Sequence, residues 1–137
     1  MKRILSLIVV AVLLALAAAV VGACSATPTT NPEVAAIRAY ADPATQTTLQ
    51  GLSEGNLAKY TQYADAQFKA AVTQALLDQV SAQINSQLGS FVSVTFSSAE
   101  KQDQYTIVHY KAKYSKGDAG VRMVFDQDHL VAGQFFE

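Results

Sequence analysis

The sequence predicts an α+β domain in which N-terminal helices pack on one face of a curved, four-stranded antiparallel meander sheet. Apolar residues between positions 32 and 88 recur at helical spacing, whereas from position 91 onward they alternate with polar residues. The connections between the alternating segments are short enough for hairpins, which favours a meander. Helices followed by strands in one chain are typical of α+β folds.

The first 23 residues have the three parts of an export signal. Lys2 and Arg3 are the basic part, and residues 4–21 are apolar apart from one serine. The segment closes with Val21-Gly22-Ala23-Cys24, which resembles the lipobox of bacterial lipoproteins. Small residues let the chain lie extended in a peptidase cleft, and the thiol accepts a diacylglyceryl thioether. We therefore expect residues 1–23 to be a lipoprotein signal peptide and Cys24 to carry the lipid.

Two other interpretations of this segment are an uncleaved membrane anchor and cleavage without lipidation. The apolar run is close to the roughly 20 residues that span a bilayer. Basic residues before an uncleaved span would leave the same domain outside the cytoplasm. The expected location is thus the extracytoplasmic side of a membrane, in the periplasm or at the cell surface. Cys24 is the chain's one cysteine, so the exported domain has no disulfide.

Residues 24–31 are predicted to be the lipidated cysteine and a flexible tether, and residues 32–137 a single domain. Because Lys2 and Arg3 lie in the leader, the remaining chain carries eight basic and eleven acidic side chains. This mild acidity gives no general attraction to nucleic acid, so a nucleic-acid partner is not expected.

The helical region is predicted to be interrupted. Asn31 caps a first helix that has Pro32 in its first turn, and Asp42-Pro43 is interpreted as a break and restart. Gly55 ends the next helical segment, and Asn56 is interpreted as the cap of the turn that follows. Shorter helical pieces follow at 57–63 and 66–72, and the clearest helix is expected at 74–88 between Thr73 and Gly89.

Strands are predicted at about 91–99, 104–115, 119–126 and 129–136. Alternation divides their side chains between two faces. The face expected to pack on the helices carries Val92, Val94, Phe96, Val108, Tyr110, Ala112, Val121, Met123, Phe125, Leu130 and Ala132. The reverse face carries Tyr105, Ile107, His109, Lys111, Lys113, Arg122, Val124, Val131 and Phe135. Simple hairpins predict Tyr110 opposite Met123, Met123 opposite Ala132 and Lys111 opposite Arg122.

Several short motifs resemble a known family. They are Gly55-Asn56 with Tyr60 and Phe68, Gln87-Leu88-Gly89, Val121 to Asp126, and Ala132 to Phe136. Together they are similar to the domain of unknown function 3887 over roughly residues 43–137. The resemblance implies a small cone-like fold of the nuclear-transport-factor-2-like and cystatin-like kind behind an export signal. It implies no catalytic residues, and His129 stands in the last turn where the family commonly has glycine.

A candidate pocket lies in the predicted cup between helices and sheet, lined by Tyr60, Phe68, Val94, Tyr110 and Met123. It could take a small apolar ligand, or it could be a filled core. An enzyme of this fold needs an acid or base inside the cup, and no carboxylate is predicted in mid-strand facing inward. No serine-nucleophile elbow occurs either. We therefore assign no catalytic residue and expect no cofactor; an isomerase-like or dehydratase-like enzyme that uses Tyr110 is the alternative.

The reverse face of the sheet carries a second candidate site, formed by His109, Lys111, Lys113 and Arg122. Like charges directly opposite one another destabilise a sheet, so these side chains either extend into solvent or bind an anion or an acidic partner. The apolar residues of the same face make it a plausible protein interface, including a homodimer through the sheet. The two histidines lie far apart in the sequence, so no metal site is expected.

The predicted function is a membrane-anchored extracytoplasmic lipoprotein with a small, non-enzymatic domain. This domain is expected to bind a small apolar ligand or a protein partner. The alternatives are the enzyme described above and a structural or assembly factor that acts through the outer sheet face.

Overall fold

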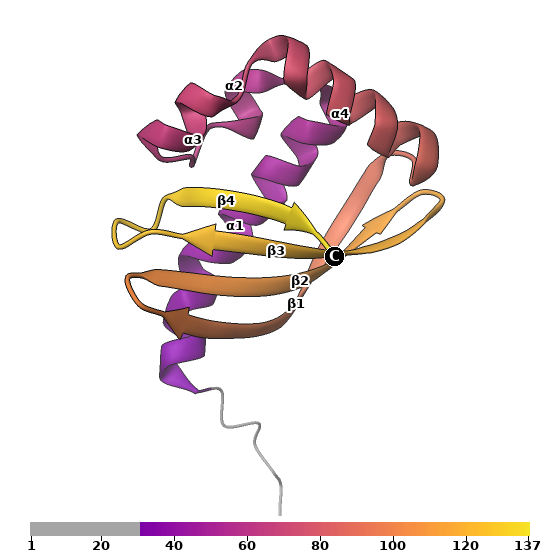
Figure 1. Ribbon diagram of the computed structural model, residues 1–137. Helices are drawn as coiled ribbons and strands as arrows, with labels where there is room; N and C mark the ends of the chain where they lie inside the picture. Colours follow the sequence, from indigo (N-terminus) through magenta and orange to yellow (C-terminus); the bar gives the residue numbers. More distant parts are fainter. Residues whose placement is uncertain (1–30) are drawn as a thin grey trace, which may run out of the picture.

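The computed structural model describes residues 31–137, which form four helices followed by four strands. The helices are α1 (Pro32–Glu54), α2 (Leu57–Tyr60), α3 (Ala66–Ala71) and α4 (Gln74–Gln87). The strands are β1 (Phe91–Gln102), β2 (Tyr105–Tyr114), β3 (Gly117–Phe125) and β4 (Val131–Phe136). They form one antiparallel sheet in the order β1-β2-β3-β4. The helices lie on one side of this sheet (Figure 1). The predicted α+β class and meander are confirmed, and the cone-like shape stays a prediction.

α1 is one continuous helix, so the predicted break at Asp42-Pro43 is wrong. Proline inside a helix removes one backbone hydrogen bond and does not by itself end the helix. An Arg38–Asp42 ion pair spans the turn just before Pro43. Buried residues occur on both sides of the proline, at Ile37, Ala41, Ala44, Thr45, Thr48, Leu49 and Leu52. Packing of this stripe therefore outweighs the lost hydrogen bond.

The helix ends follow the predicted capping residues. Asn31, Asn56 and Thr73 accept hydrogen bonds from backbone amides at the starts of α1, α2 and α4. Gly55 ends α1 with a φ of 66°, in the left-handed region that glycine adopts without steric cost. Asp65 caps α3 in the same way through the amide of Phe68. Side-chain oxygens thus satisfy amides that a helix start leaves free.

Three bulges set the register of the sheet. The pairing skips Val92 and Ser97 in β1, and Ala132 in β4. An extra residue on one strand shifts every later side chain to the opposite face. This explains three wrong assignments: Val92 and Leu130 are 57% and 37% exposed, whereas Val131 is fully buried.

The predicted cross-strand pairs are also wrong. Tyr110 lies opposite Val121, and Met123 lies opposite Val108 and Gln134. For Tyr110 the β2–β3 turn causes the difference, because the strands end at Tyr114 and begin again at Gly117, closer together than the sequence predicted. For Met123 the difference lies in the β3–β4 pairing, where Gln134 stands opposite it in place of Ala132, which the pairing skips. The faces of β2 and β3 are nevertheless as predicted, since the register differs by an even number of residues.

The core lies between α1 and the inner face of the sheet. Its fully buried side chains come from α1, β2, β3 and the start of β4, and include Leu49, Val108, Val121, Met123, Phe125 and Val131. A polar junction joins three elements beside this core. Asn85 of α4 donates to the carbonyl of Ser53 in α1, and the Ser53 hydroxyl accepts the amide of Phe91 in β1. These bonds hold the C-terminal end of α1 against the first strand.

Candidate functional site

Tyr60 and Phe68, the two helical residues of the predicted pocket, do pack together. Their ring centroids are 5.7 Å apart. The Tyr60 hydroxyl donates to Gln134 Oε1 of β4 at 3.0 Å, which ties α2 to the sheet. Burial raises the pKa of Tyr60 to about 12, so the hydroxyl stays protonated at neutral pH. Tyr60 is thus a satisfied structural tyrosine.

Tyr110 of the predicted pocket is bound to a carboxylate that the sequence interpretation missed. Its hydroxyl donates to Asp42 Oδ1 at 2.8 Å, and burial together with Asp42 raises the pKa of Tyr110 above its usual range. The other Asp42 oxygen, Oδ2, forms an ion pair with the Arg38 guanidinium at 3.0 Å. Asp42 was expected in a helix break, whereas the continuous α1 brings it to Tyr110. The spacing of Arg38 and Asp42, four residues apart, was the available sequence signal.

The five candidate pocket residues do not line a common cavity. Met123 is fully buried and Tyr110 is 3% exposed, whereas Val94 and Phe68 are half-buried. Tyr60 lines the smallest of five hollows in residues 31–137, and the other four candidate residues line none of these hollows. That hollow measures about 60 Å³ and lies among Leu52, Tyr60, Val72, Leu76, Leu77 and Val80. Side chains therefore occupy the centre of the predicted cup.

The candidate anion face is arranged differently from the prediction. Lys111 lies opposite Gly120, and the residue opposite Arg122 is His109. Carboxylates neighbour three of the four side chains. Lys111 pairs with Asp118 at 3.1 Å. His109 Nδ1 and Arg122 Nε lie 3.1 Å and 3.8 Å from the two carboxylate oxygens of Glu137. Only Lys113 of the four makes no ion pair within residues 31–137, so this face is largely neutralised.

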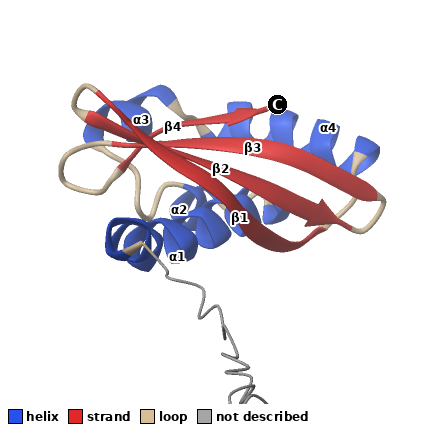
Figure 2. Ribbon diagram, turned by 90° about the horizontal axis from the view of Figure 1, so that it is seen from below, coloured by secondary structure: helices blue, strands red, loops and turns tan. Residues whose placement is uncertain are grey.

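No described helix covers the outer face of the sheet (Figure 2), and apolar side chains of β2, β3 and β4 lie on this face. Ile107 and Val124 lie opposite each other in β2 and β3. Tyr105 precedes them in β2 and is 37% exposed, and Phe135 of β4 is 48% exposed. The Arg122 guanidinium lies over the Phe135 ring, 4.8 Å from its centroid. This apolar row, Tyr105, Ile107, Val124 and Phe135, is called the outer-face row below.

A groove of about 440 Å³ lies beside Tyr105, between the start of α3 and the β3–β4 turn. Its lining combines the exposed side chains of Tyr105 and Leu130 with three carboxylates, Asp65, Asp126 and Asp128. Asp126 Oδ1 accepts the amides of Asp128 and Leu130, which shapes the turn. The sequence interpretation missed this groove because its residues come from three separate connections.

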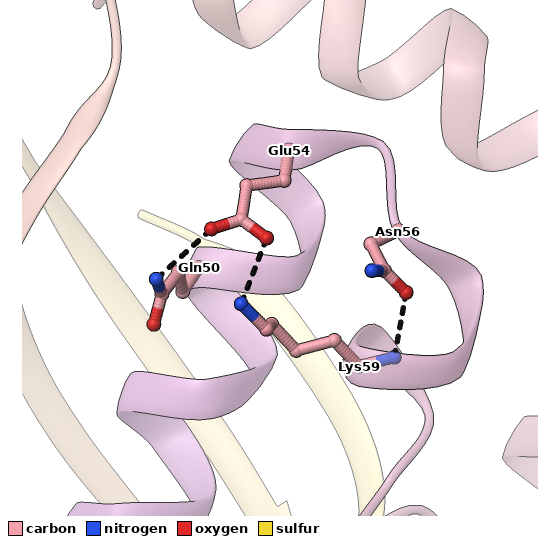
Figure 3. Close-up of polar contacts among 4 residues, drawn as sticks. All are labelled: Gln50, Glu54, Asn56 and Lys59. Carbon is pink, nitrogen blue, oxygen red and sulfur yellow. Dashed lines mark hydrogen bonds and ion pairs between the residues drawn. The ribbon is translucent and has the colours of Figure 1, made fainter.

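A polar cluster at the α1–α2 junction is satisfied internally (Figure 3). Glu54 accepts hydrogen bonds from Gln50 at 2.9 Å and from Lys59 at 2.8 Å, and Asn56 accepts the amide of Lys59. The hydrogen bonds from Lys59 and Gln50 hold the pKa of Glu54 below its usual value. Both carboxylate oxygens are engaged, so the cluster serves to join α1 to α2.

Residues 31–137 contain neither a metal-binding group of side chains nor a membrane-spanning helix. Within residues 31–137, no three His, Cys, Asp or Glu side chains are grouped so as to hold a metal ion. No helix in that part of the chain is long and apolar enough to cross a membrane. Cys24 and the signal peptide proposed for residues 1–23 lie outside the described residues.

Comparison with known proteins gives one match. Residues 46–133 match the family described as "Protein of unknown function (DUF3887)", which covers more than half of the chain. No curated protein and no solved structure matches the chain.

Proposed function

We propose that this chain, which belongs to the DUF3887 family, is an extracytoplasmic lipoprotein. Its domain binds another protein through the outer face of its sheet. The uncovered outer-face row is the observation that carries this proposal. Tyr105 and Phe135 are among the few large apolar side chains exposed in residues 31–137. An apolar patch with charged neighbours is typical of a protein interface.

The interior supports this function better than it supports ligand binding. The side chains at the centre of the predicted cup are buried against one another, and the hollow beside Tyr60 measures about 60 Å³. Ligand sites for small organic molecules have volumes of about 300–1,000 Å³. A ligand of that size would therefore have to displace core side chains.

The geometry at Tyr110 does not favour the enzyme alternative. Asp42 is a carboxylate beside a tyrosine, which an isomerase-like mechanism would use. However, one Asp42 oxygen accepts the Tyr110 hydroxyl and the other binds Arg38. Neither Tyr110 nor Asp42 lines any of the five hollows described above. None of these hollows therefore gives a substrate access to the pair.

The lipid anchor is supported by the sequence before the domain. Seven residues separate Cys24 from Pro32, the first residue of α1. An extended chain spans at most about 3.5 Å per residue, so the anchor would hold the domain within about 30 Å of the bilayer. Replacing Cys24 by alanine is expected to move the protein from the membrane fraction to the soluble fraction. Retention of the Cys24→Ala protein in the membrane would instead support the uncleaved anchor.

Site-specific photo-cross-linking in the protein's own host tests the interaction surface. A benzophenone amino acid placed at Phe135 is expected to give a discrete cross-linked protein adduct. The same probe at Gln83, exposed on α4, is the matched control and is expected to give none. Equal adducts at both positions, or an adduct at position 83 alone, would contradict the proposal.

A further inference from the structure

We propose that the partner reaches the outer face with a cationic segment, whose lysine or arginine side chains enter the groove beside Tyr105. This inference rests on the proposed interaction function and names the chemistry of the partner. The proposed partner is opposite in charge to the anion or acidic partner that the sequence offered, as the alternative to solvent exposure, for His109, Lys111, Lys113 and Arg122.

The ion pairs within residues 31–137 leave five carboxylates without a basic partner there. Six carboxylates form ion pairs there: Glu33, Asp42, Glu54, Glu100, Asp118 and Glu137. The remaining five do not, and four of them, Asp65, Asp103, Asp126 and Asp128, line the adjoining hollows at Tyr105. The basic side chains of the outer face are mostly neutralised, whereas the carboxylates at its edge are not. The uncompensated charge next to the outer-face row is therefore negative.

Two adjoining hollows shape this edge of the outer face. The groove of about 440 Å³ and a neighbouring hollow of about 260 Å³ share Gln104, Tyr105, Asp126 and Gln127. Tyr105 belongs to the outer-face row and also lines both hollows. The apolar row thus continues into an acidic groove without an intervening element.

Lysine and arginine side chains are chemically complementary to this edge. Lysine and arginine have aliphatic stems that pack on apolar surface and cationic heads that pair with carboxylates. A cation over the face of a tyrosine ring gains further electrostatic stabilisation. Tyr105 and Leu130 supply apolar surface, and Asp128 supplies a carboxylate with no hydrogen bond to its side chain from residues 31–137. An acidic segment would meet more carboxylates than basic groups at this edge, because Lys101, which also lines the second hollow, is already paired with Glu33.

The groove lies near the end of the domain at which α1 begins. Glu33, in the first turn of α1, pairs with Lys101 at 2.8 Å. The start of α1 therefore lies beside the β1–β2 turn, and Asp103 lies in that turn. The cationic segment would consequently bind at the end of the domain that carries the tether, close to the bilayer surface.

Two synthetic peptides test the charge of the partner. The full chain, expressed in a bacterium and purified in mild non-ionic detergent, is titrated with Arg-Phe-Arg-Leu-Arg and with Glu-Phe-Glu-Leu-Glu, and amide chemical shifts are followed by NMR. We expect the cationic peptide to shift the amides of Tyr105, Asp128 and Leu130. The Kd of the cationic peptide should be lower than that of the acidic peptide by about tenfold or more. It should rise with salt concentration, as for an electrostatic contact.

A matched pair of variants separates the groove from overall charge. Asp128→Asn is expected to raise the Kd of the cationic peptide about threefold, as for the loss of one exposed charge pair. Asp78→Asn removes the same charge from α4, outside the groove, and should leave the Kd unchanged. Equal effects of the two variants would overturn the inference, as would shifts centred on Lys111 and Lys113. If a Phe135 cross-link persists while the cationic peptide fails to bind, the partner's charge is wrong and the interaction function stands.

Discussion

At the scale of single residues, the contact between α1 and α2 depends on the absence of a side chain at Gly51. A Cβ atom added there would lie 2.8 Å from Tyr60 Cα and 2.9 Å from the carbonyl carbon of Lys59. These are backbone atoms and cannot rotate away. Tyr60 in turn holds α2 to β4 through Gln134. A methyl group at position 51 would therefore displace α2 and its bond to the sheet.

We expect Gly51→Ala to lower the free energy of unfolding by about 1–3 kcal/mol, as overpacking does. This loss should appear even though alanine is favoured over glycine within a helix by about 1 kcal/mol. Urea unfolding followed by circular dichroism measures it. Gly117→Ala is the matched control, because its nearest neighbour is a leucine methyl at 3.8 Å. A Gly51→Ala protein as stable as the control would contradict the close packing of α1 and α2.

Thr48 presents the opposite situation, a buried polar group without a partner. Its side chain is fully buried and its hydroxyl makes no hydrogen bond within the described residues. An unsatisfied buried hydroxyl costs about 1–3 kcal/mol, and an apolar replacement of the same shape removes that cost. We expect Thr48→Val to raise the free energy of unfolding by about 1 kcal/mol. A destabilised Thr48→Val protein would show that the hydroxyl does have a partner.

Buried tyrosines make the fold sensitive to alkaline pH. Burial raises the pKa of Tyr60 and of Tyr114 to about 12, above the value near 10 of an unfolded chain. The folded state therefore favours the protonated forms. Stability from this source is complete below about pH 10 and is lost as the pH rises through about 12.

Urea unfolding between about pH 9 and pH 11.5 should show this decline, with tyrosine ionisation followed by absorbance. The Tyr114 hydroxyl has no hydrogen-bond partner within residues 31–137, so Tyr114→Phe removes a titrating group and breaks no hydrogen bond. Its stability is expected to fall less steeply with pH than that of the unchanged protein. Identical slopes would refute the shifted pKa of Tyr114.

At the scale of elements, α1 persists through Pro43 because its buried stripe continues on both sides of the proline. Pro43 itself is exposed, so its ring contributes little to the core. We therefore expect Pro43→Ala to raise the free energy of unfolding by about 1–3 kcal/mol, since alanine restores the missing N–H within a helix. Thermal unfolding measures the change.

Pro32→Ala is the matched control for this substitution. Pro32 stands in the first turn of α1, where the missing N–H would have no helical partner. Its replacement should change the stability only slightly. A Pro43→Ala protein that is no more stable than the Pro32→Ala protein would indicate a true interruption of α1 at Asp42-Pro43.

Which elements form was predictable from the sequence, whereas the register of the sheet was not. Capping residues such as Asn31, Asn56 and Thr73 identified the helix starts, because they act on amides close to them in the chain. A bulge at Ala132 depends on how β3 and β4 fit together, and no local pattern records it. The extra residue at Ala132 places Val131 on the inner face and leaves Leu130 exposed, which is the reverse of the prediction.

At the scale of the whole molecule, the two candidate sites differed in how far the sequence could define them. Alternation of residues located the outer-face row correctly for Tyr105, Ile107, Val124 and Phe135. The ion pairs that neutralise His109 and Arg122 involve Glu137, which lies in neither β2 nor β3 and depends on the fold for its position. The same holds for Asp42 beside Tyr110. Charge balance across distant segments is a property of the folded chain.

The central claim is that the interior is a packed core and that the protein works through its outer face. Native mass spectrometry of the protein, purified in mild detergent from the membranes of its own host, tests this most directly. We expect a lipidated chain that begins at Cys24, either alone or bound to a protein partner, with no small molecule retained. A small molecule held in a one-to-one complex would contradict the packed core and would place the function in the cup.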